Sequence, residues 1–394
     1  MKFLIMVMLL VLICKEVCLS QWVVGNNYVG GWTESIIGNG NDLLVGTVRF
    51  GLVSDSKGIY RSTDNGITWS QTSFNIYGVR CFVSDSSVIY AGSNNGLYVS
   101  TNGGISWSNP APAMHFDTFC LCKKGGTIYL GDGTAQNVVK TTNRGVSWTQ
   151  VLTGNTPFSM TVVGENIFVG TINGTFLSTN NGSNWNITSL TEETRTLSSR
   201  DNAVFAGTLY SLYKSTNLGV NWLEILNRRV NNIAIGDSVI IVGGNGISIS
   251  GDNGNSWNYK NEGFNGSPFI RSLLIWNNYV YAGIDSNVWR RPLNEIIGIE
   301  QINTKIPEFS NLKQNFPNPF NPNTSIEFSI PKETYISIKI YNSIGQLYRT
   351  EVNQELSAGT YKINVEMSDF PSGIFFYQLI TNDFKETKKM VMIK

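Results

Sequence analysis

STDNGITW, at residues 62–69, is the first of six octets that decide the fold of this chain. The octets share the pattern Ser/Thr-x-Asp/Asn-x-Gly-x-x-Trp, and the other five are STNGGISW (100–107), TTNRGVSW (141–148), STNNGSNW (178–185), STNLGVNW (215–222) and SGDNGNSW (250–257). Successive octets begin 35 to 41 residues apart. A repeat of this length is typical of solenoids and propellers, in which each copy is one supersecondary unit.

Each octet has the residue chemistry of a tight turn. Asp or Asn at the third position accepts hydrogen bonds from backbone N–H groups about two residues on, and Gly at the fifth position takes positive φ without a Cβ clash. Trp at the eighth position begins the next strand and offers a large apolar surface. Because four of the six third positions hold uncharged Asn, we expect a structural turn and neither a metal site nor an acid–base site. The three positions are Asp64, Gly66, Trp69; Asn102, Gly104, Trp107; Asn143, Gly145, Trp148; Asn180, Gly182, Trp185; Asn217, Gly219, Trp222; and Asp252, Gly254, Trp257.

The remainder of each repeat indicates β-strands. Runs such as GIYRS, GLYVS, GTFLS and SLYKS precede the octets, and helical periodicity is absent. A second strand in each repeat ends in Gly, and seven copies are present: LLVG (43–46), VIYAG (88–92), TIYLG (127–131), NIFVG (166–170), AVFAG (203–207), VIIVG (239–243) and YVYAG (279–283). We therefore predict an all-β domain of seven units.

The six octets resemble the Asp-box of bacterial neuraminidase repeats, which occurs in the propellers of sialidases, xyloglucanases, sortilin and photosystem II assembly factors. The resemblance implies a seven-bladed β-propeller over residues 21–293, with the box between the third and fourth strands of a blade. The seventh unit has no octet. We predict that an N-terminal strand containing Trp32 completes that unit, because a closed ring leaves only short, protected strand edges.

The end of the chain has a different pattern. Residues 294–312 are polar and free of octets, which predicts a linker. Prolines in QNFPNPFNPNTSIEFSIP (314–331) exclude helix, and the short alternating strands that follow predict an immunoglobulin-like β-sandwich over residues 313–394. NFPNPFNP (315–322), IYNSIGQ (340–346), LSAGTYKINV (356–365), PSGIFFYQL (371–379) and the basic end (388–394) resemble the type A C-terminal sorting domain of the type IX secretion system. This resemblance implies that the secretion machinery is a partner and that it carries the protein across the outer membrane.

The first twenty residues have the form of a cleaved secretory signal. Lys2 precedes eleven apolar residues, 3–13, and small residues lie just before Gln21. The apolar run is shorter than the ~20 residues that cross a bilayer, and we identify no later run apolar enough to do so. We predict a signal peptide at residues 1–20, passage through the periplasm, and a final location outside the cell or on its outer surface.

Composition excludes several classes of function. The 29 Lys and Arg balance 28 Asp and Glu, a net charge of +1, which argues against binding of nucleic acid. His115 is the single histidine, so His-cluster metal sites and most His-based catalysis are excluded. We predict that Cys81, Cys120 and Cys122 are plain buried thiols, and we expect neither a metal nor a cofactor.

One position of the repeat is a candidate binding site. Counting back ten residues from Tyr90, Tyr129, Phe168, Phe205, Ile241 and Tyr281 gives Arg80, Phe119, Phe158, Arg195, Asn231 and Arg271. Three arginines then share one place near the start of the innermost strands, where side chains converge on the channel. Because a guanidinium group suits a carboxylate or phosphate, we predict a ligand site of Arg80, Arg195, Arg271 and Phe158. Tyr77, Phe116 and Phe269 are candidates to stack on a ligand ring, and Asp117, Glu192 and Glu193 are candidate acidic neighbours.

Two classes of function fit this pattern. The first is an exported binding or interaction protein whose ligand is a glycan or a protein. The second is a hydrolase or lyase that acts on glycans, as sialidases and xyloglucanases do. Sialidases hold the sialic acid carboxylate with three arginines, but this chain has no Arg-Ile-Pro segment and no evident nucleophilic Tyr with a paired Glu. Since a glycosidase needs two suitably spaced carboxyl groups and none can be paired from the sequence, we nominate no catalytic residue and favour binding.

Overall fold

The computed structural model describes most of the chain from Gln21 onward. The described residues are 21–27, 31–48, 58–85, 88–236, 239–251, 253–264, 266–285, 287–296, 298–303, 305–367 and 370–394. The predicted signal peptide (1–20) and the octet residue Asp252 lie outside them. Within these ranges the chain forms β-strands and one helix of four residues, α2 (Leu293–Ile296), so the fold is all-β.

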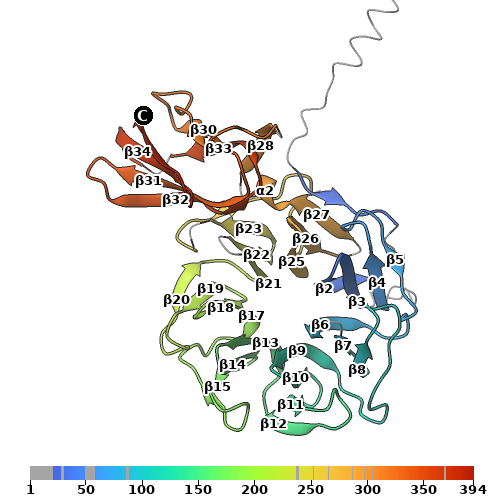
Figure 1. Ribbon diagram of the computed structural model, residues 1–394. Helices are drawn as coiled ribbons and strands as arrows, with labels where there is room; N and C mark the ends of the chain where they lie inside the picture. Colours follow the sequence, from blue (N-terminus) through green and yellow to red (C-terminus); the bar gives the residue numbers. More distant parts are fainter. Residues whose placement is uncertain are drawn as a thin grey trace, which may run out of the picture.

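Seven sheets surround a central axis, as Figure 1 shows, and the first part of the chain is a β-propeller. The innermost strand of each sheet contacts the innermost strands of both neighbouring sheets, including β2 against β25, so the ring is closed. From the axis outward, the blades are β2 (Trp32–Asn39), β3 (Asp42–Val48), β4 (Gly58–Ser62), β5 (Ser70–Gln71) in blade 1; β6 (Val79–Asp85), β7 (Val88–Ser93), β8 (Gly96–Ser100) in blade 2; β9 (Thr118–Lys124), β10 (Thr127–Asp132), β11 (Asn137–Thr141), β12 (Thr149–Thr153) in blade 3; β13 (Pro157–Val163), β14 (Asn166–Thr171), β15 (Gly174–Ser178), β16 (Asn186–Ile187) in blade 4; β17 (Thr194–Arg200), β18 (Ala203–Thr208), β19 (Leu212–Ser215), β20 (Leu223–Leu226) in blade 5; β21 (Asn232–Ile235), β22 (Ile240–Gly244), β23 (Gly246–Ser250), β24 (Asn258–Tyr259) in blade 6; and β25 (Ser272–Trp276), β26 (Tyr279–Gly283), β27 (Val288–Pro292), β1 (Val23–Val24) in blade 7.

An N-terminal strand completes the last blade, but it is not the strand that the sequence indicated. β1 pairs with β27, through Val23 with Arg290 and Val24 with Trp289. The strand that contains Trp32, β2, is instead the innermost strand of blade 1, because a tight turn at residues 40–41 folds it directly against β3. The prediction that the strand of Trp32 belongs to the seventh blade is therefore wrong.

Glycines at the ends of the second strands let neighbouring blades approach closely. A Cβ atom added at Gly170 would lie 2.8 Å from the carbonyl oxygen of Thr194 in the next blade. Gly46, Gly131, Gly207, Gly243 and Gly283 likewise face a side chain in, or just before, the next innermost strand, and Gly283 of blade 7 faces Thr33 of blade 1. The strand-ending glycines therefore mark the places where the blades meet around the whole ring.

The octets form turns after the third strand of their blades, and a fourth strand follows except in blade 2, where the isolated bridge of Val99 with Ser108 takes its place. In blade 4, Ser178 Oγ accepts from the N–H of Gly182 at 2.8 Å, and Asn180 Oδ1 accepts from the N–H of Asn184 at 2.8 Å. The amide that Asn180 reaches is four residues on, not two as predicted, because Asn181 and Gly182 both take positive φ, 56° and 78°. All six octet glycines have positive φ, as predicted: Gly66, Gly104, Gly145, Gly182, Gly219 and Gly254. Trp69 is buried, whereas the other five octet tryptophans are half-buried.

The C-terminal part is a β-sandwich with one hydrophobic core between two sheets. One sheet has the order β28 (Ile299–Asn303), β33 (Gly359–Glu366), β30 (Asn323–Ile330), β29 (Asn311–Leu312), and the other has the order β32 (Leu347–Leu356), β31 (Thr334–Asn342), β34 (Gly373–Ile380), β35 (Lys385–Met392). β28 and β29 belong to the segment 294–312, in which we expected only a linker. The pairing of β28 with β33 makes much of that segment part of the sandwich.

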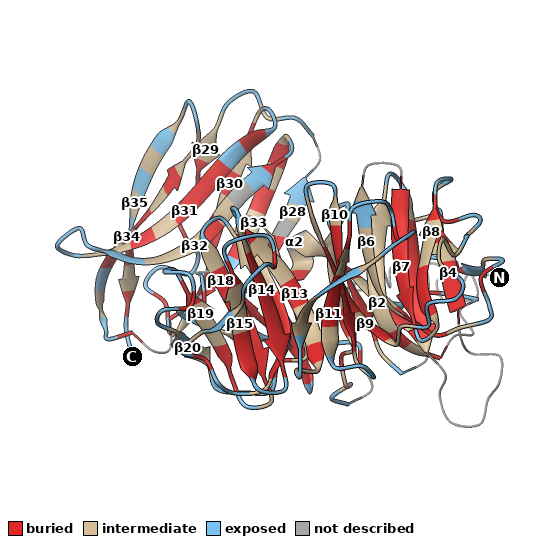
Figure 2. Ribbon diagram, turned by 90° about the horizontal axis from the view of Figure 1, so that it is seen from below, coloured by how far each residue is buried: buried red, intermediate tan, exposed pale blue. Residues whose placement is uncertain are grey.

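Burial follows this architecture. Figure 2 shows buried residues along the middle strands of the blades and between the sheets of the sandwich, whereas exposed residues gather in the connecting loops. Among the described residues, no helix has the length and apolar character needed to cross a membrane.

Candidate functional site

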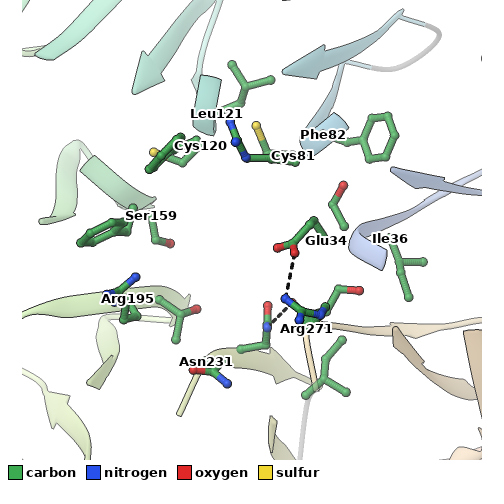
Figure 3. Close-up of a pocket in the computed structure, with 18 of the residues that line it drawn as sticks. Glu34, Ile36, Cys81, Phe82, Cys120, Leu121, Ser159, Arg195, Asn231 and Arg271 are labelled. Carbon is green, nitrogen blue, oxygen red and sulfur yellow. Dashed lines mark hydrogen bonds and ion pairs between the residues drawn. The ribbon is translucent and has the colours of Figure 1, made fainter. Parts of the chain in front are cut away.

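A cavity of about 540 Å³ opens on the propeller axis between the innermost strands (Figure 3). Its size lies in the range of ~300–1,000 Å³ that is usual for small-ligand sites. Each blade contributes one residue from an equivalent position, and we call these the slot residues: Glu34, Arg80, Phe119, Phe158, Arg195, Asn231 and Arg271 in blades 1 to 7. The four residues nominated from the sequence, Arg80, Phe158, Arg195 and Arg271, thus line one cavity.

Irregular strand pairing explains why the slot residues face the axis. In blade 5, Thr194 pairs with Thr208 and Thr196 pairs with Gly207, so Arg195 between them has no partner in the ladder. The same skip, a β-bulge, occurs at Glu34, Arg80, Phe119 and Phe158. Because a bulge re-aims the side chain of the extra residue, these side chains turn into the channel. In blades 6 and 7 the slot residue lies just before the first paired residue.

Each slot arginine is held by carboxylates and by an aromatic ring. Arg80 forms an ion pair with Asp117, and Arg195 forms one with Glu193. Arg271 contacts two carboxylates, Glu34 at 3.1 Å and Asp285 at 2.7 Å. Its guanidinium carbon also lies 3.7 Å from the ring centroid of Trp32. The arginines are therefore fixed in orientation before any ligand arrives.

Phe119 and Phe158 form an aromatic wall in blades 3 and 4. Their centroids are 6.3 Å apart and their planes differ by 22°. Arg80 lies 4.7 Å from the centroid of Phe119, and Arg195 lies 4.3 Å from that of Phe158. The four side chains form a continuous stack across blades 2 to 5, in which cation–π contacts hold the outer members.

Glu34 is a slot residue that the sequence interpretation missed. Counting back ten residues from Leu44, two residues before Gly46, gives Glu34, but the sequence pattern around Trp32 wrongly places this strand in the seventh blade. Burial raises the pKa of the Glu34 carboxyl above its ordinary value, and the charge and hydrogen bond of Arg271 oppose that rise. Figure 3 shows Glu34 and Arg271 facing each other at the cavity.

Arg229 also lines the cavity and was not predicted. It precedes the slot residue Asn231 by two positions, in the loop before β21, where the repeat gives no signal. Arg229 Nε donates to Asn231 Oδ1 at 2.9 Å, and its guanidinium carbon lies 5.1 Å from the centroid of Phe269. Phe269, one of the three predicted stacking residues, is part of the lining as well.

Other residues suggested as neighbours lie elsewhere. Tyr77 packs near Tyr98, with centroids 6.1 Å apart, and Phe116 packs on Trp148 at 5.4 Å. Neither is part of the cavity lining, because each belongs to the hydrophobic cluster between two blades. Glu192 accepts a hydrogen bond from the hydroxyl of Tyr213 at 2.9 Å and lies outside the lining.

Cys81 and Cys120 reach the cavity wall, and neither is in a disulfide. Burial raises the pKa of the Cys81 thiol to about 12, and burial also raises the pKa of the Cys120 thiol. Since the thiolate is the nucleophilic form, neither group is an activated nucleophile at neutral pH. Among the described residues, no cluster of three or more His, Cys, Asp or Glu side chains is arranged to hold a metal ion.

The described side chains that line the cavity are more basic than acidic. Among the described lining residues, four are arginines and Glu34 is the one carboxylate. Asp117, Glu193 and Asp285 contact the arginines from outside the lining. Glycoside hydrolysis generally uses two carboxyl groups that flank the scissile bond, and the lining supplies one.

Comparison with known proteins identifies the end of the chain. Residues 314–394 match the family model of the secretion system C-terminal sorting domain. This domain marks proteins that the type IX system exports to the cell surface or the medium, and it implies contact with the secretion machinery. No curated protein matches the chain.

Solved structures with a similar fold include two larger proteins. The extracellular domain of BT4673 from B. thetaiotaomicron is 14% identical, with a TM-score of 0.58, over 84% of this chain and 51% of that one. An ancestral GH74 enzyme is 15% identical, with a TM-score of 0.53, over 94% of this chain and 63% of that one. This chain therefore spans between half and two thirds of each of those proteins. Identities this low show the shared fold alone. Together with the match of residues 314–394, they identify the chain as an exported β-propeller protein with a C-terminal sorting domain.

Proposed function

We propose that this protein is an exported glycan-binding protein whose ligand occupies the central cavity of the propeller. The observation that carries the proposal is the meeting of Arg80, Arg195 and Arg271, from three blades, with Phe158 around one cavity. The edges of the aromatic rings in the lining pack against the apolar surface of a sugar, and guanidinium groups bind its hydroxyl or carboxylate oxygens. A concave site also suits a glycan better than the flat surface that a folded protein partner needs.

The alternative, a glycan-active hydrolase or lyase, receives less support from the cavity. Glu34 lies next to Arg271, and the other nearby carboxylates contact arginines outside the lining. No second carboxylate in the described lining is positioned to act with Glu34 as acid or base. Binding therefore remains the function that the geometry favours.

The proposal includes the organisation of the chain. Residues 1–20 are a signal peptide, 21–293 the propeller and 313–394 the sorting domain, and residues 294–312 join the last two while adding β28 and β29 to the sandwich. The octets are Asp-boxes in this proposal, and the octet hydrogen bonds of Ser178 and Asn180 support a purely structural role for them. We propose no metal or cofactor, and we propose that the ligand lies on the propeller and not on the sorting domain.

The test is a glycan array probed with the full exported protein, together with a panel of fluorogenic glycosides. We expect binding to a subset of glycans and no hydrolysis. Arg195→Gln and Arg271→Gln should weaken binding about tenfold or more, because each removes a charged hydrogen-bond donor from the cavity. Arg61→Gln is the matched control, since Arg61 pairs with Asp42 between β3 and β4 and lies outside the cavity. Turnover of any glycoside that Glu34→Gln abolishes would favour the enzyme instead.

A further inference from the structure

The four arginines that line the cavity differ in how far their charge is neutralised. Arg80, Arg195 and Arg271 each contact at least one carboxylate. Arg229 forms no ion pair among the described residues, and its one hydrogen bond there is the donation from Nε to Asn231. Arg229 is also exposed. Both terminal nitrogens of Arg229 therefore remain able to donate to an anion.

The surroundings of Arg229 supply a second hydrogen-bond donor for an anion. The Phe269 ring lies between two guanidinium groups, with Arg229 5.1 Å and Arg271 5.2 Å from its centroid. Asn231 accepts from Arg229 through Oδ1, while its Nδ2 is enclosed and has no hydrogen-bond partner among the described residues. An unsatisfied amide donor in a wall of this kind is stabilised when a ligand or a water accepts from it.

The opposite side of the cavity is aromatic. Blades 3 and 4, which carry Phe119 and Phe158, lie across the axis from blades 6 and 7, which carry Arg229 and Phe269 (Figure 1). The stacked rings of Phe119 and Phe158 contact Arg80 and Arg195, whose charges are already paired. The cavity thus has one side with a guanidinium group, that of Arg229, which has no carboxylate partner among the described residues, and one side formed by the edges of two aromatic rings.

We propose, on the basis of the proposed function, that the cavity binds a terminal uronate residue of an acidic glycan, with its carboxylate on Arg229 and its ring toward Phe119 and Phe158. One guanidinium group without a counterion matches one negative charge, whereas Glu34 beside Arg271 repels a second. A monoanionic carboxylate therefore fits better than a dianionic phosphate. Because the innermost strands of all seven blades surround the cavity, a glycan reaches it along the axis, where a chain end meets less steric hindrance than an internal residue does.

The experiment is isothermal titration calorimetry on the full exported protein with three tetrasaccharides. They are identical except for the terminal residue, which is a glucuronate, a glucose or a sulfated glucose. We expect the glucuronate form to bind about tenfold more tightly than the glucose form, and Arg229→Gln to remove that difference. Arg228→Gln is the control, because Arg228 donates to Ser248 and to the carbonyl of Asn245 and does not line the cavity.

The outcomes separate this inference from the proposed function. If Arg229→Gln and Arg228→Gln bind the glucuronate form equally tightly, the uronate assignment is wrong. It is also wrong if the wild-type protein binds the glucose form or the sulfated form as tightly as the glucuronate form. In either case binding that Arg195→Gln weakens would leave the proposed function standing. If wild type binds none of the three and the array is also blank, both proposals fail. Unchanged thermal melting of Arg229→Gln shows that any loss of binding is not a loss of folding.

Discussion

The indole of Trp22 stacks on the ring of Phe264, with centroids 5.0 Å apart and planes inclined by 21°. Trp22 is 2% exposed, its N–H donates to the carbonyl of Glu262 at 2.8 Å, and its Nε1 donates to the carbonyl of Lys260 at 2.7 Å. The two following residues form β1, which pairs in blade 7. One short segment therefore contacts blades 6 and 7 at once, beside the place where the ring closes.

Replacing Trp22 by Ala should lower the free energy of unfolding by about 3–5 kcal/mol, because the change leaves a large buried cavity between two blades. Urea denaturation followed by tryptophan fluorescence measures the loss. Val23→Ala is the control, since Val23 is 50% exposed and keeps the β1 backbone pairing. Equal stability of the two variants would mean that the segment does not hold the ring closed.

Gly170→Ala tests the contact between neighbouring blades. The added Cβ would lie 2.8 Å from a backbone oxygen of Thr194, which cannot move without shifting β17. We expect a loss of about 1–3 kcal/mol in a denaturant titration. At Gly126 an added Cβ meets nothing within 4 Å, so Gly126→Ala should differ little from wild type. A neutral Gly170→Ala would show that blades 4 and 5 are less tightly packed than described.

Glu34→Gln should stabilise the protein at neutral pH. Burial raises the pKa of Glu34 in the folded state above its value in the unfolded chain. The protonated carboxyl therefore contributes stability below the unfolded pKa, and this contribution is lost as the pH rises through the folded pKa. The advantage of the Gln variant should therefore shrink as the pH falls toward 4.5, which unfolding curves between pH 4 and 8 will measure. The exposed Glu165 has the opposite behaviour, because its hydrogen bond to Lys124 lowers its pKa. Glu165→Gln should lose stability at neutral pH, and a Glu34→Gln variant that behaves the same way would contradict the argument.

Removing the sorting domain should stop export. A chain that ends at residue 296 and one that ends at residue 312 should both accumulate in the periplasm, as fractionation and surface proteolysis would show. The longer form retains β28 and β29 but loses their partners β33 and β30, so it should be cleaved by protease sooner than the shorter form. Surface exposure of either truncated chain would contradict the sorting assignment.

The sequence predicted most of the propeller because its repeated positions have strict steric demands. Gly182 occupies positive φ, and Gly170 faces the backbone of the next blade, so neither position tolerates a side chain well. The closing strand was assigned wrongly because β1 has two residues and belongs to no octet. Trp32 resembled the final Trp of an octet, yet it lies under Arg271 at the axis.

The candidate site was predictable to the extent that it follows the repeat. The count of ten found six of the seven slot residues because the slot residue lies at a constant distance from the strand-ending glycine in every blade. It omitted Glu34 only through the error in assigning β2. Arg229 lies in a loop outside the periodic pattern, so its approach to Phe269 required the folded chain.

The bulges have a further consequence for how such a protein can change its ligand. Since Arg195 and its counterparts at Glu34, Arg80, Phe119 and Phe158 take no part in the ladder, replacing their side chains leaves every paired residue beside them in register. The ring already holds acidic, basic, amide and aromatic side chains at this one position. Substitutions at these five positions can therefore change the ligand selectivity of the channel while the strand pairing of the blades stays the same.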